Sequence, residues 1–135
     1  MTRMAKQFGL LLAAALVLLW SPAPAAAAEK GPLDGKTFAG EMTEKGKTKG
    51  DQDTFVFKDG KFRSTACDAY GFTETAYTAA VSDVGTTFEA VSTSPKEGTM
   101  KWKGTVKGDS VEATAVWTKK GQADAIYTFK GALKK

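Results

Sequence analysis

The sequence contains no histidine and only one cysteine, Cys67. Without histidine the chain cannot form a Ser-His-Asp or Cys-His catalytic arrangement, a His-ligated haem, or the common zinc sites built from His and Cys. A single cysteine excludes an intramolecular disulfide and a C-x-x-C redox motif. The sequence therefore predicts a protein that is not an enzyme and that holds neither a cofactor nor a metal ion.

A strong excess of one charge is also absent. The chain has 19 Lys and Arg against 15 Asp and Glu, a formal net charge of +4. Nucleic-acid-binding domains usually carry a larger basic excess, clustered on one face. We therefore expect no nucleic-acid partner.

One long apolar run occurs, at the N-terminus. Arg3 and Lys6 precede the apolar residues 8–20, and residues 26–28 offer an A-x-A cleavage site. A basic start, a short apolar run and small residues at the end are the three parts of a secretory signal peptide. The alternative is a retained anchor, although the run is short for crossing a bilayer. Residues 1–28 are predicted to be a signal peptide.

The rest of the chain, residues 29–135, has the length of one small domain. No other stretch is apolar enough to span a membrane. The sequence predicts an exported protein, periplasmic or secreted, that does not span the membrane after signal cleavage.

Residues 99–118 carry the clearest structural pattern, a β-hairpin. Small or apolar residues alternate with lysine and threonine up to a two-residue turn at Gly108 and Asp109. Alternation of this kind gives a strand one buried face and one solvated face. If Lys107 lies opposite Ser110, the predicted inward pairs are Val106 with Val111, Gly104 with Ala113, Trp102 with Ala115, and Met100 with Trp117.

The remaining segments show the same two-residue period. Asp59 and Gly60 form a second strong hairpin signal, which places Phe57 opposite Phe62 and Phe55 opposite Ser64. Beyond the two strands of the first hairpin, the predicted strands are 36–42, 52–58, 61 to about 67, 74–81, 86–92 and 124–133.

About eight short strands joined only by turns require antiparallel neighbours. The predicted fold is therefore all-β, an antiparallel up-and-down β-barrel of about eight strands, which buries every apolar face and leaves no free edge. Gly40, Gly104 and Gly131 are predicted to allow bends. A two-sheet β-sandwich remains the alternative, because alternation alone cannot separate the two architectures.

The chain resembles a known group in several short motifs. It has a G-x-x-F start at residues 35–38, successive hairpins, and a late W-x-G at residues 102–104. In these it resembles small exported bacterial barrels of the lipocalin-like, or calycin-like, group. Residues 67–72, CDAYGF, are similar to a segment of an uncharacterised family of exported proteins. The resemblance implies a barrel, and it implies no particular activity.

Connection lengths distinguish two ends of the predicted barrel. Alternate connections of an up-and-down barrel lie at the same end, and here every second connection is tight. The inward residues near the tight-turn end are bulky: Phe38, Phe57, Phe62, Val81, Phe88, Val106 and Val111. Those near the looped end are mixed: Met42, Phe55, Ala66, Tyr77, Ala90, Met100, Trp117 and Tyr127.

This looped end is the candidate binding site. Aromatic residues with a polar group suit the mouth of a pocket for a small apolar or amphipathic ligand. The candidate ligand-binding residues are Tyr70, Phe72, Tyr77, Met100, Trp117 and Tyr127. The alternative is a filled core whose loop aromatics simply close the end, since side chains can fill an eight-stranded barrel.

Cys67 lies at the end of the predicted third strand. A lone thiol in an exported protein could join two chains, and Cys67 is expected to face outward if Ala66 faces inward. The alternative is a small apolar residue without chemistry, because only Arg63 is a nearby cation that could activate the thiol. The oligomeric state is left open.

Charged side chains offer weaker candidates. The carboxylates Asp51, Asp53 and Asp59 are interpreted as turn residues, since a calcium loop of the EF-hand type needs more oxygen ligands. Asp68 and Glu74 flank the aromatic loop, and the sequence does not give the distance between their carboxylates. A set of lysines, Lys101, Lys103, Lys107 and Lys130, is predicted to form a solvated outer face.

Three functions are consistent with the sequence. The first is a non-enzymatic exported barrel that binds a small hydrophobic ligand at its looped end, in a cavity lined by Tyr77, Met100, Trp117 and Tyr127. The second is a structural or protein-interaction barrel with a filled core and an exposed apolar patch around Tyr70 and Phe72. An enzyme is the third and least supported, because no nucleophile with a base is visible.

Overall fold

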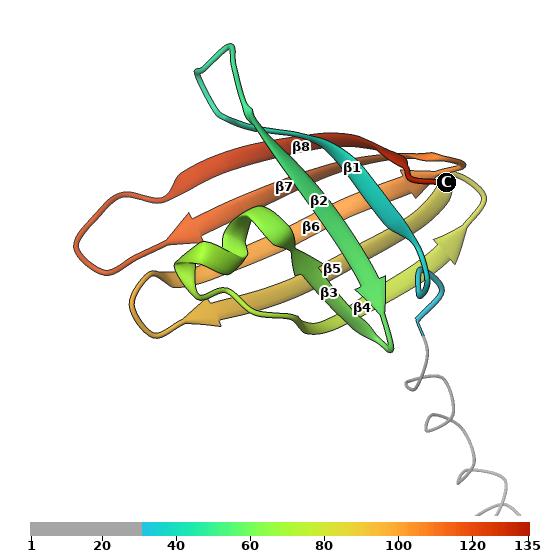
Figure 1. The fold of residues 1–135 in the computed structure, drawn as a ribbon, viewed down its shortest axis with the longest axis horizontal. Coiled ribbons are helices and arrows are strands. Elements are labelled where there is room, and N and C mark those ends of the chain that lie inside the picture. The colour runs from blue at the N-terminus through green and yellow to red at the C-terminus, as the bar shows by residue number, and fades with distance from the viewer. Residues whose placement is uncertain (1–30) are drawn as a thin grey trace, which may run out of the picture.

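A computed structural model describes residues 31–135, which form one closed antiparallel β-barrel (Figure 1). Its strands are β1 (Thr37–Glu44), β2 (Asp51–Lys58), β3 (Lys61–Ser64), β4 (Thr75–Ser82), β5 (Gly85–Ser94), β6 (Gly98–Lys107), β7 (Ser110–Thr118) and β8 (Ala125–Leu133). Neighbours in sequence are neighbours in the barrel, and β1 pairs with β8 to close it. The predicted up-and-down barrel is confirmed. The predicted signal peptide, residues 1–28, lies outside the described residues.

Both hairpin registers are as predicted. In β6 and β7 Lys107 lies opposite Ser110, and Trp102 lies opposite Ala115. In β2 and β3 Phe57 lies opposite Phe62. In the middle of β6 and β7 a large residue, Trp102, therefore faces a small one, whereas two rings meet across β2 and β3.

Aromatic rings fill the middle of the barrel. Phe55 is fully buried and stacks on Phe129, with ring centroids 3.8 Å apart. Phe62 and Trp102 meet the Phe55 ring edge-on, at 4.9 and 5.4 Å. Such edge-to-face contacts add to the hydrophobic gain of burial. The prediction that Phe55 lies near the mouth is wrong, because its ring lies at the centre of this cluster.

Glycines let strands and rings approach closely, as the predicted bends require. Gly40 of β1 lies opposite Gly131 of β8, and a Cβ at Gly40 would stand 2.0 Å from the Lys130 carbonyl oxygen. A Cβ at Gly104 would stand 2.6 Å from the Phe88 ring. Any larger residue at these positions would push a strand or a ring outward.

The third strand is shorter than predicted. β3 ends at Ser64, and a short 3₁₀ helix, η2 (Thr65–Tyr70), follows it. The helical turn reverses the expected facing, so Ala66 is exposed and Cys67 is buried. The predictions that Ala66 faces inward and that Cys67 faces outward are therefore both wrong.

The fourth strand extends beyond its neighbour. Only two residue pairs join β3 and β4, Lys61 with Ala76 and Phe62 with Thr75. β4 continues past the β2–β3 turn, so Val81 pairs with β5 on one side only, has no strand on its β3 side, and is 70% exposed. The prediction that Val81 helps to fill the barrel is therefore wrong.

The two ends of the barrel differ as predicted. The tight turns after β2, β4 and β6 each contain two residues, whereas the connections at the other end include η2 and the long β1–β2 loop (Figure 1). Between residues 31 and 135 no helix is long and apolar enough to cross a membrane.

Candidate functional site

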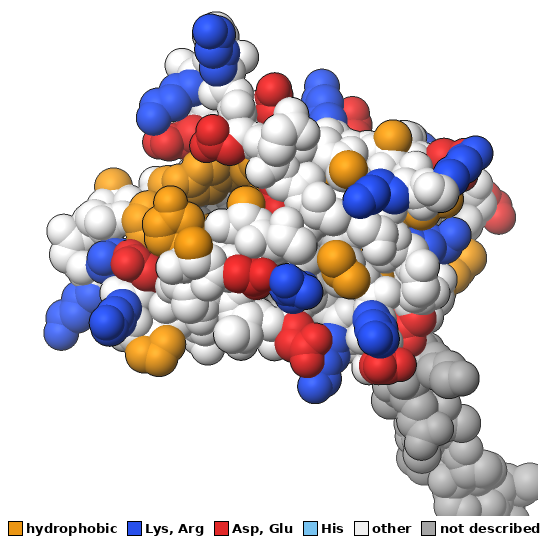
Figure 2. Space-filling model, in the orientation of Figure 1, with side chains coloured by type: hydrophobic (Ala, Val, Ile, Leu, Met, Phe, Trp, Pro, Cys, Tyr) orange, Lys and Arg blue, Asp and Glu red, His pale blue; other side chains and the backbone are white. Residues whose placement is uncertain are grey.

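A cavity of about 330 Å³ opens at the looped end of the barrel. Figure 2 shows hydrophobic side chains gathered at this end, beneath the β1–β2 loop and beside charged groups. Its lining residues come from five strands, η2 and three connections: Met42, Glu44, Lys47, Lys49, Gly50, Asp51, Ala66, Cys67, Tyr70, Phe72, Glu97, Met100, Trp117 and Tyr127. The volume lies at the small end of the roughly 300–1,000 Å³ range of ligand pockets.

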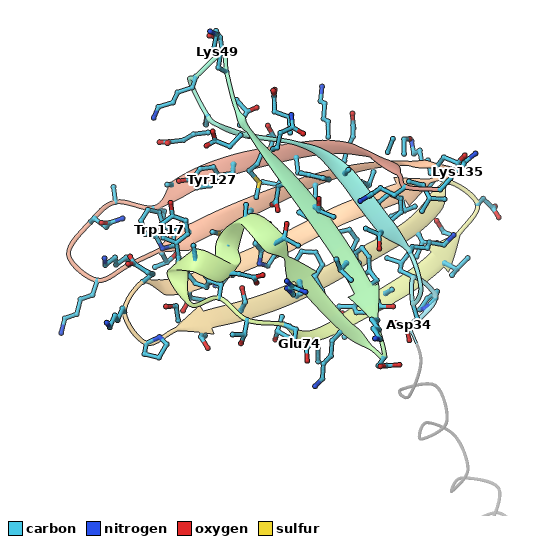
Figure 3. The ribbon with its side chains drawn as sticks, in the orientation of Figure 1. Asp34, Lys49, Glu74, Trp117, Tyr127 and Lys135 are labelled. Carbon is cyan, nitrogen blue, oxygen red and sulfur yellow. The ribbon has the colours of Figure 1, made fainter. Side chains whose placement is uncertain are left out.

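Five of the six predicted ligand-binding residues line this cavity. They are Tyr70, Phe72, Met100, Trp117 and Tyr127. Figure 3 places Trp117 and Tyr127 close together at the looped end. Their strands are neighbours, β7 and β8, and both side chains follow the inward period. The inward alternation therefore located Met100, Trp117 and Tyr127, and the loop after the third strand supplied Tyr70 and Phe72.

Tyr77 does not line the cavity. Its hydroxyl donates a hydrogen bond to the Asp34 carboxylate at 2.7 Å and accepts one from the Leu33 N–H at 3.2 Å. Asp34 also accepts from the Gly60 N–H in the β2–β3 turn, at the end of the barrel opposite the cavity (Figure 3). The short pairing of β4 with β3 places Tyr77 at this end of the barrel. The prediction that Tyr77 lines the cavity is therefore wrong.

The Trp117 indole is fixed at the cavity wall. Its Nε1–H donates to the Glu97 carbonyl oxygen at 2.6 Å. The Glu97 carboxylate accepts from the Lys119 ammonium at 2.9 Å, and this joins the β5–β6 turn to the end of β7. A ring held in this way needs little ordering when a ligand contacts it.

Tyr127 is partly buried and packs against the core. Burial, with a smaller contribution from the nearby Glu44 carboxylate, raises the pKa of the Tyr127 phenol. The phenol therefore stays neutral at physiological pH and can donate or accept a hydrogen bond at the cavity.

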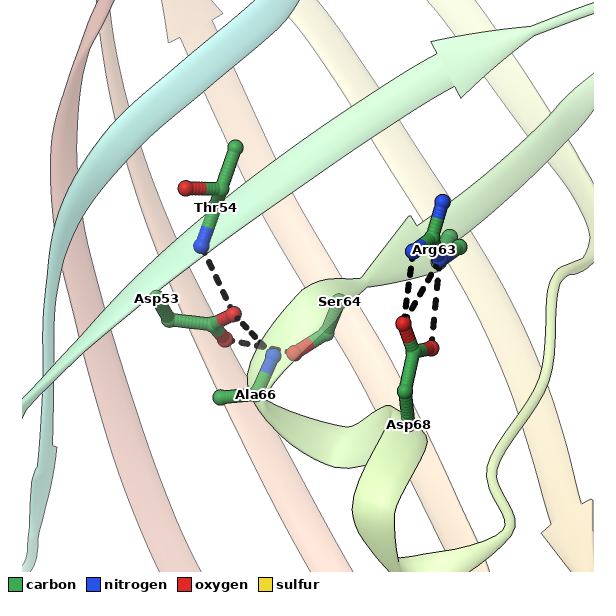
Figure 4. A network of polar contacts seen from close by, with 6 residues as sticks. All are labelled: Asp53, Thr54, Arg63, Ser64, Ala66 and Asp68. Carbon is green, nitrogen blue, oxygen red and sulfur yellow. Dashed lines mark hydrogen bonds and ion pairs between the residues drawn. The ribbon is translucent and has the colours of Figure 1, made fainter.

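A buried carboxylate holds η2 against the barrel. Asp53 is only 3% exposed, and it accepts hydrogen bonds from the Ser64 hydroxyl at 2.5 Å and the Ala66 N–H at 2.9 Å (Figure 4). It also accepts from the Thr54 N–H at 2.7 Å. Asp53 therefore satisfies one N–H group at the start of η2, that of Ala66, which the helix itself leaves unpaired.

The interpretation of Asp53 as a turn residue is thus wrong. It shares the inward period with Phe55 and Phe57 in β2, which is a signal that the sequence does contain. Burial of a carboxylate is rare unless it is paired or hydrogen-bonded. Here three donors make burial possible, and those donors are visible only in the folded chain.

Cys67 lies on the cavity wall and is 7% exposed. Burial raises the pKa of its thiol, which therefore stays protonated near neutral pH. In this position Cys67 acts as a small apolar lining group. A disulfide to a second chain would first require η2 to open.

The two loop aromatics have different environments. Tyr70 is 60% exposed, whereas Phe72 is buried. Gly71 separates them in a left-handed conformation with φ of 86°, and the Tyr70 carbonyl accepts a hydrogen bond from the Ser94 hydroxyl at 2.7 Å. Only Tyr70 is therefore available as an exposed ring at the mouth.

Charged groups of both signs surround the opening. Lys47 pairs with Glu44 at 3.2 Å, and Lys49 extends from the tip of the β1–β2 loop (Figure 3). Asp51 stands at the base of the same loop. The apolar floor is thus bordered by groups that can bind a polar or charged part of a ligand.

Other charged candidates do not join this cavity. Asp68 forms a bidentate pair with Arg63, and Glu74 pairs with Lys61 at 3.6 Å. The lysines Lys101, Lys103, Lys107 and Lys130 are all exposed, as predicted. Among residues 31–135 no group of three or more His, Cys, Asp or Glu side chains could hold a metal ion.

Comparison of this chain with protein-family models, with curated proteins and with solved structures finds no match.

Proposed function

We propose that this protein is an exported, non-enzymatic β-barrel that binds a small hydrophobic or amphipathic ligand at its looped end. The observation that carries the proposal is the cavity, with Met42, Met100, Phe72 and Trp117 in its wall. An apolar pocket with a few convergent polar groups is the usual form of a small-molecule site.

The lining favours an amphipathic ligand. An apolar portion can contact the sulfur and aromatic side chains of the floor, because burying that surface is the main source of affinity. A polar portion can reach Lys49, Asp51 or the Tyr127 hydroxyl at the opening. Since lysine and carboxylate both border the opening, the charge of the polar portion is left to experiment.

Export rests on the sequence of residues 1–28. The protein is proposed to act in the periplasm or outside the cell and to be free of the membrane after signal cleavage. Its general shape is consistent with a lipocalin-like, or calycin-like, barrel. Membership of that group remains part of the proposal.

A protein-interaction or structural role is the second candidate. The exposed Tyr70 ring favours it, because Tyr is enriched in protein interfaces. The filled middle of the barrel also suits a purely structural body. Burial of Phe72 reduces the apolar patch to one ring and so weakens this candidate.

Native mass spectrometry of the protein recovered after export is the first test. The ligand-binding proposal expects a reproducible added mass that organic extraction removes. A bare mass after gentle purification would support the second candidate. A shorter chain beginning near residue 29 would also establish signal cleavage.

A fluorescent apolar probe, N-phenyl-1-naphthylamine, provides a second test. Ala66 and Ala69 are both exposed on η2, but only Ala66 lines the cavity. We expect Ala66→Trp to obstruct the cavity and weaken probe binding at least about tenfold, equivalent to about 1.4 kcal/mol. The matched Ala69→Trp variant should bind as the wild type does, and equal loss in both would contradict binding in this cavity.

A further inference from the structure

A second feature of the barrel has no connection with the cavity. β4 runs beyond β3 at the tight-turn end, and its only partner there is β5. Pairing with β3 stops at Ala76, apart from the Tyr77 N–H, which donates to the Gly60 carbonyl at 3.2 Å. Along residues 78–82 one side of the strand is therefore an open sheet edge within the part of the chain that the structure describes (Figure 1).

The alternation of an antiparallel strand identifies the free backbone groups. Because the Tyr77 N–H points toward β3, residues two and four positions later point the same way. The residues in between, Thr78, Ala80 and Ser82, direct their backbone groups to β5. The open edge thus presents the N–H and C=O groups of Ala79 and Val81.

Within residues 31–135 this edge lacks the usual protection against strand pairing. Natural edge strands are commonly blocked by lysine, proline, a bulge or a covering loop. β4, with the sequence TAYTAAVS, has no charged residue and no proline. Val81 is 70% exposed and Val84, in the adjoining turn, is 65% exposed. Exposed apolar groups beside an unpaired edge favour pairing with another strand.

We propose that β4 pairs antiparallel with β4 of a second copy of this chain, about a two-fold axis at Ala80. That axis places Ala79 opposite Val81 of the second copy, and Val81 opposite its Ala79. Both pairs are then hydrogen-bonded pairs, so all four free groups on each edge find a partner. An isologous interface of this kind requires a self-complementary surface, and this edge is self-complementary in its hydrogen-bonding groups.

The lengths and charges of the two edges also fit. Ser82 of the second copy lies opposite Thr78, and the β4–β5 turn of that copy begins after Ser82. The pairing therefore ends before Tyr77, whose N–H already donates to the Gly60 carbonyl. Because residues 75–82 are uncharged, the two-fold axis brings no like charges together along the paired strands. The self-complementary hydrogen-bonding groups, without repulsion between the two edges, favour a second copy as the occupant.

A charge-swap experiment tests the register. Ala80 is exposed and lies opposite itself across the axis, with Cβ atoms about 4.5–5.5 Å apart. Ala80→Lys alone and Ala80→Glu alone each place like charges face to face, so each should weaken self-association at least about tenfold. An equal mixture of the two variants should associate at least as strongly as the wild type. Sedimentation velocity over a wide range of protein concentration measures all three.

The matched control is Ala132→Lys, which adds the same side chain at an exposed alanine of β8 and should leave association unchanged. Circular dichroism of each variant checks that the barrel is folded. A cross-linking variant, Ala80→Cys with Cys67→Ser, should form a disulfide dimer under mild oxidation, whereas Ala132→Cys with Cys67→Ser should not.

Three results would overturn the proposal. They are a wild-type protein that stays monomeric at every concentration, a dimer that Ala80→Lys leaves intact, and a mixture of the two charge variants that fails to associate. The proposal does not depend on the cavity, so probe binding by Ala80→Lys should equal that of the wild type.

Discussion

The two halves of this barrel are built from the same strands but end differently. Toward the tight turns the inward positions are phenylalanines in mutual contact, and Phe57 alone meets the rings of Phe62, Tyr77 and Phe88 at 5.0–5.3 Å. Toward the loops the inward positions include Met42 and Met100, and a cavity of about 330 Å³ is left. Side-chain size along one alternating pattern therefore decides which part of a small barrel is filled and which is hollow.

The connections reinforce this difference. Two-residue turns bring neighbouring strands together at one end, where Asp34 and Tyr77 join the lead-in, the β2–β3 turn and β4. At the other end η2 and the β1–β2 loop both contribute side chains to the lining of the cavity. The β1–β2 loop projects beyond the barrel (Figure 1). The filled half of the barrel can thus hold in place the strands that surround the cavity in the other half.

The largest expected effect contrasts the filled half with the cavity. Phe55→Ala should lower the free energy of unfolding by about 3–5 kcal/mol, because four neighbouring aromatic rings lose contact with it. Met42→Ala should cost less than about 2 kcal/mol, since Met42 is only partly buried beside an existing cavity. Urea unfolding measures both, and equal losses would contradict the proposed difference between the halves.

The second effect concerns Asp53, which holds η2 against the barrel. Asp53→Ala should cost about 1.5–3 kcal/mol, because charge-assisted hydrogen bonds to Ser64 and Ala66 are lost. η2 should then open more often, and Cys67 should react faster with a thiol reagent. The comparison of unfolding free energy with the labelling rate separates local opening from global unfolding. Unchanged labelling would mean that Asp53 does not hold η2 in place.

The third effect is at the tight-turn end and depends on pH. Tyr77→Phe should cost about 1 kcal/mol near neutral pH, since the bonds with Asp34 and Leu33 are lost. Burial, together with the bond to Asp34, raises the pKa of the Tyr77 phenol above the unfolded value of about 10.

This raised pKa sets the direction of the pH dependence. The stability that Tyr77 contributes is complete below about pH 10 and falls at higher pH, because the unfolded chain then loses the phenol proton first. The difference between wild type and Tyr77→Phe should therefore shrink above about pH 10 in urea titrations. A difference that stays constant would show that the phenol ionises equally in both states.

The smallest effect is expected at an exposed ion pair between β3 and η2, beside the buried Asp53. Arg63 and Asp68 form a bidentate ion pair, which raises the pKa of the Arg63 guanidinium (Figure 4). Because both side chains are in contact with solvent, Arg63→Ala should change the unfolding free energy by less than about 1 kcal/mol. A larger loss than that of Asp53→Ala would reverse the order expected from burial.

The barrel was preferred to a sandwich because it leaves no free strand edge. The alternation of residues was sufficient to predict the strands, two hairpin registers and part of the cavity lining. It works because a strand has a fixed period of two, so Trp117 and Tyr127 must share the face of Met100. It failed where the chain left that period. At residues 65–70 the backbone forms η2, and the facings of Ala66 and Cys67 were reversed.

Tyr77 and Val81 were misplaced for a different reason. The two side chains were correctly predicted to lie on the same face of β4. Their position along the barrel axis depends on how β3 and β4 pair, and only two residue pairs define that pairing. No local pattern specifies such a short pairing. The hydrogen bonds of Asp34 and Gly60 to this region join residues far apart in the sequence.

The sequence by itself determined the all-β class, the strand order and which end carries the loops, because these follow from local periodicity and turn chemistry. The tertiary structure alone decided that Asp53 could be buried, that η2 would turn Cys67 inward, and that β4 would keep one edge unpaired by residues 31–135. Each of these depends on contacts between distant residues, whose energies no local stretch of the chain contains.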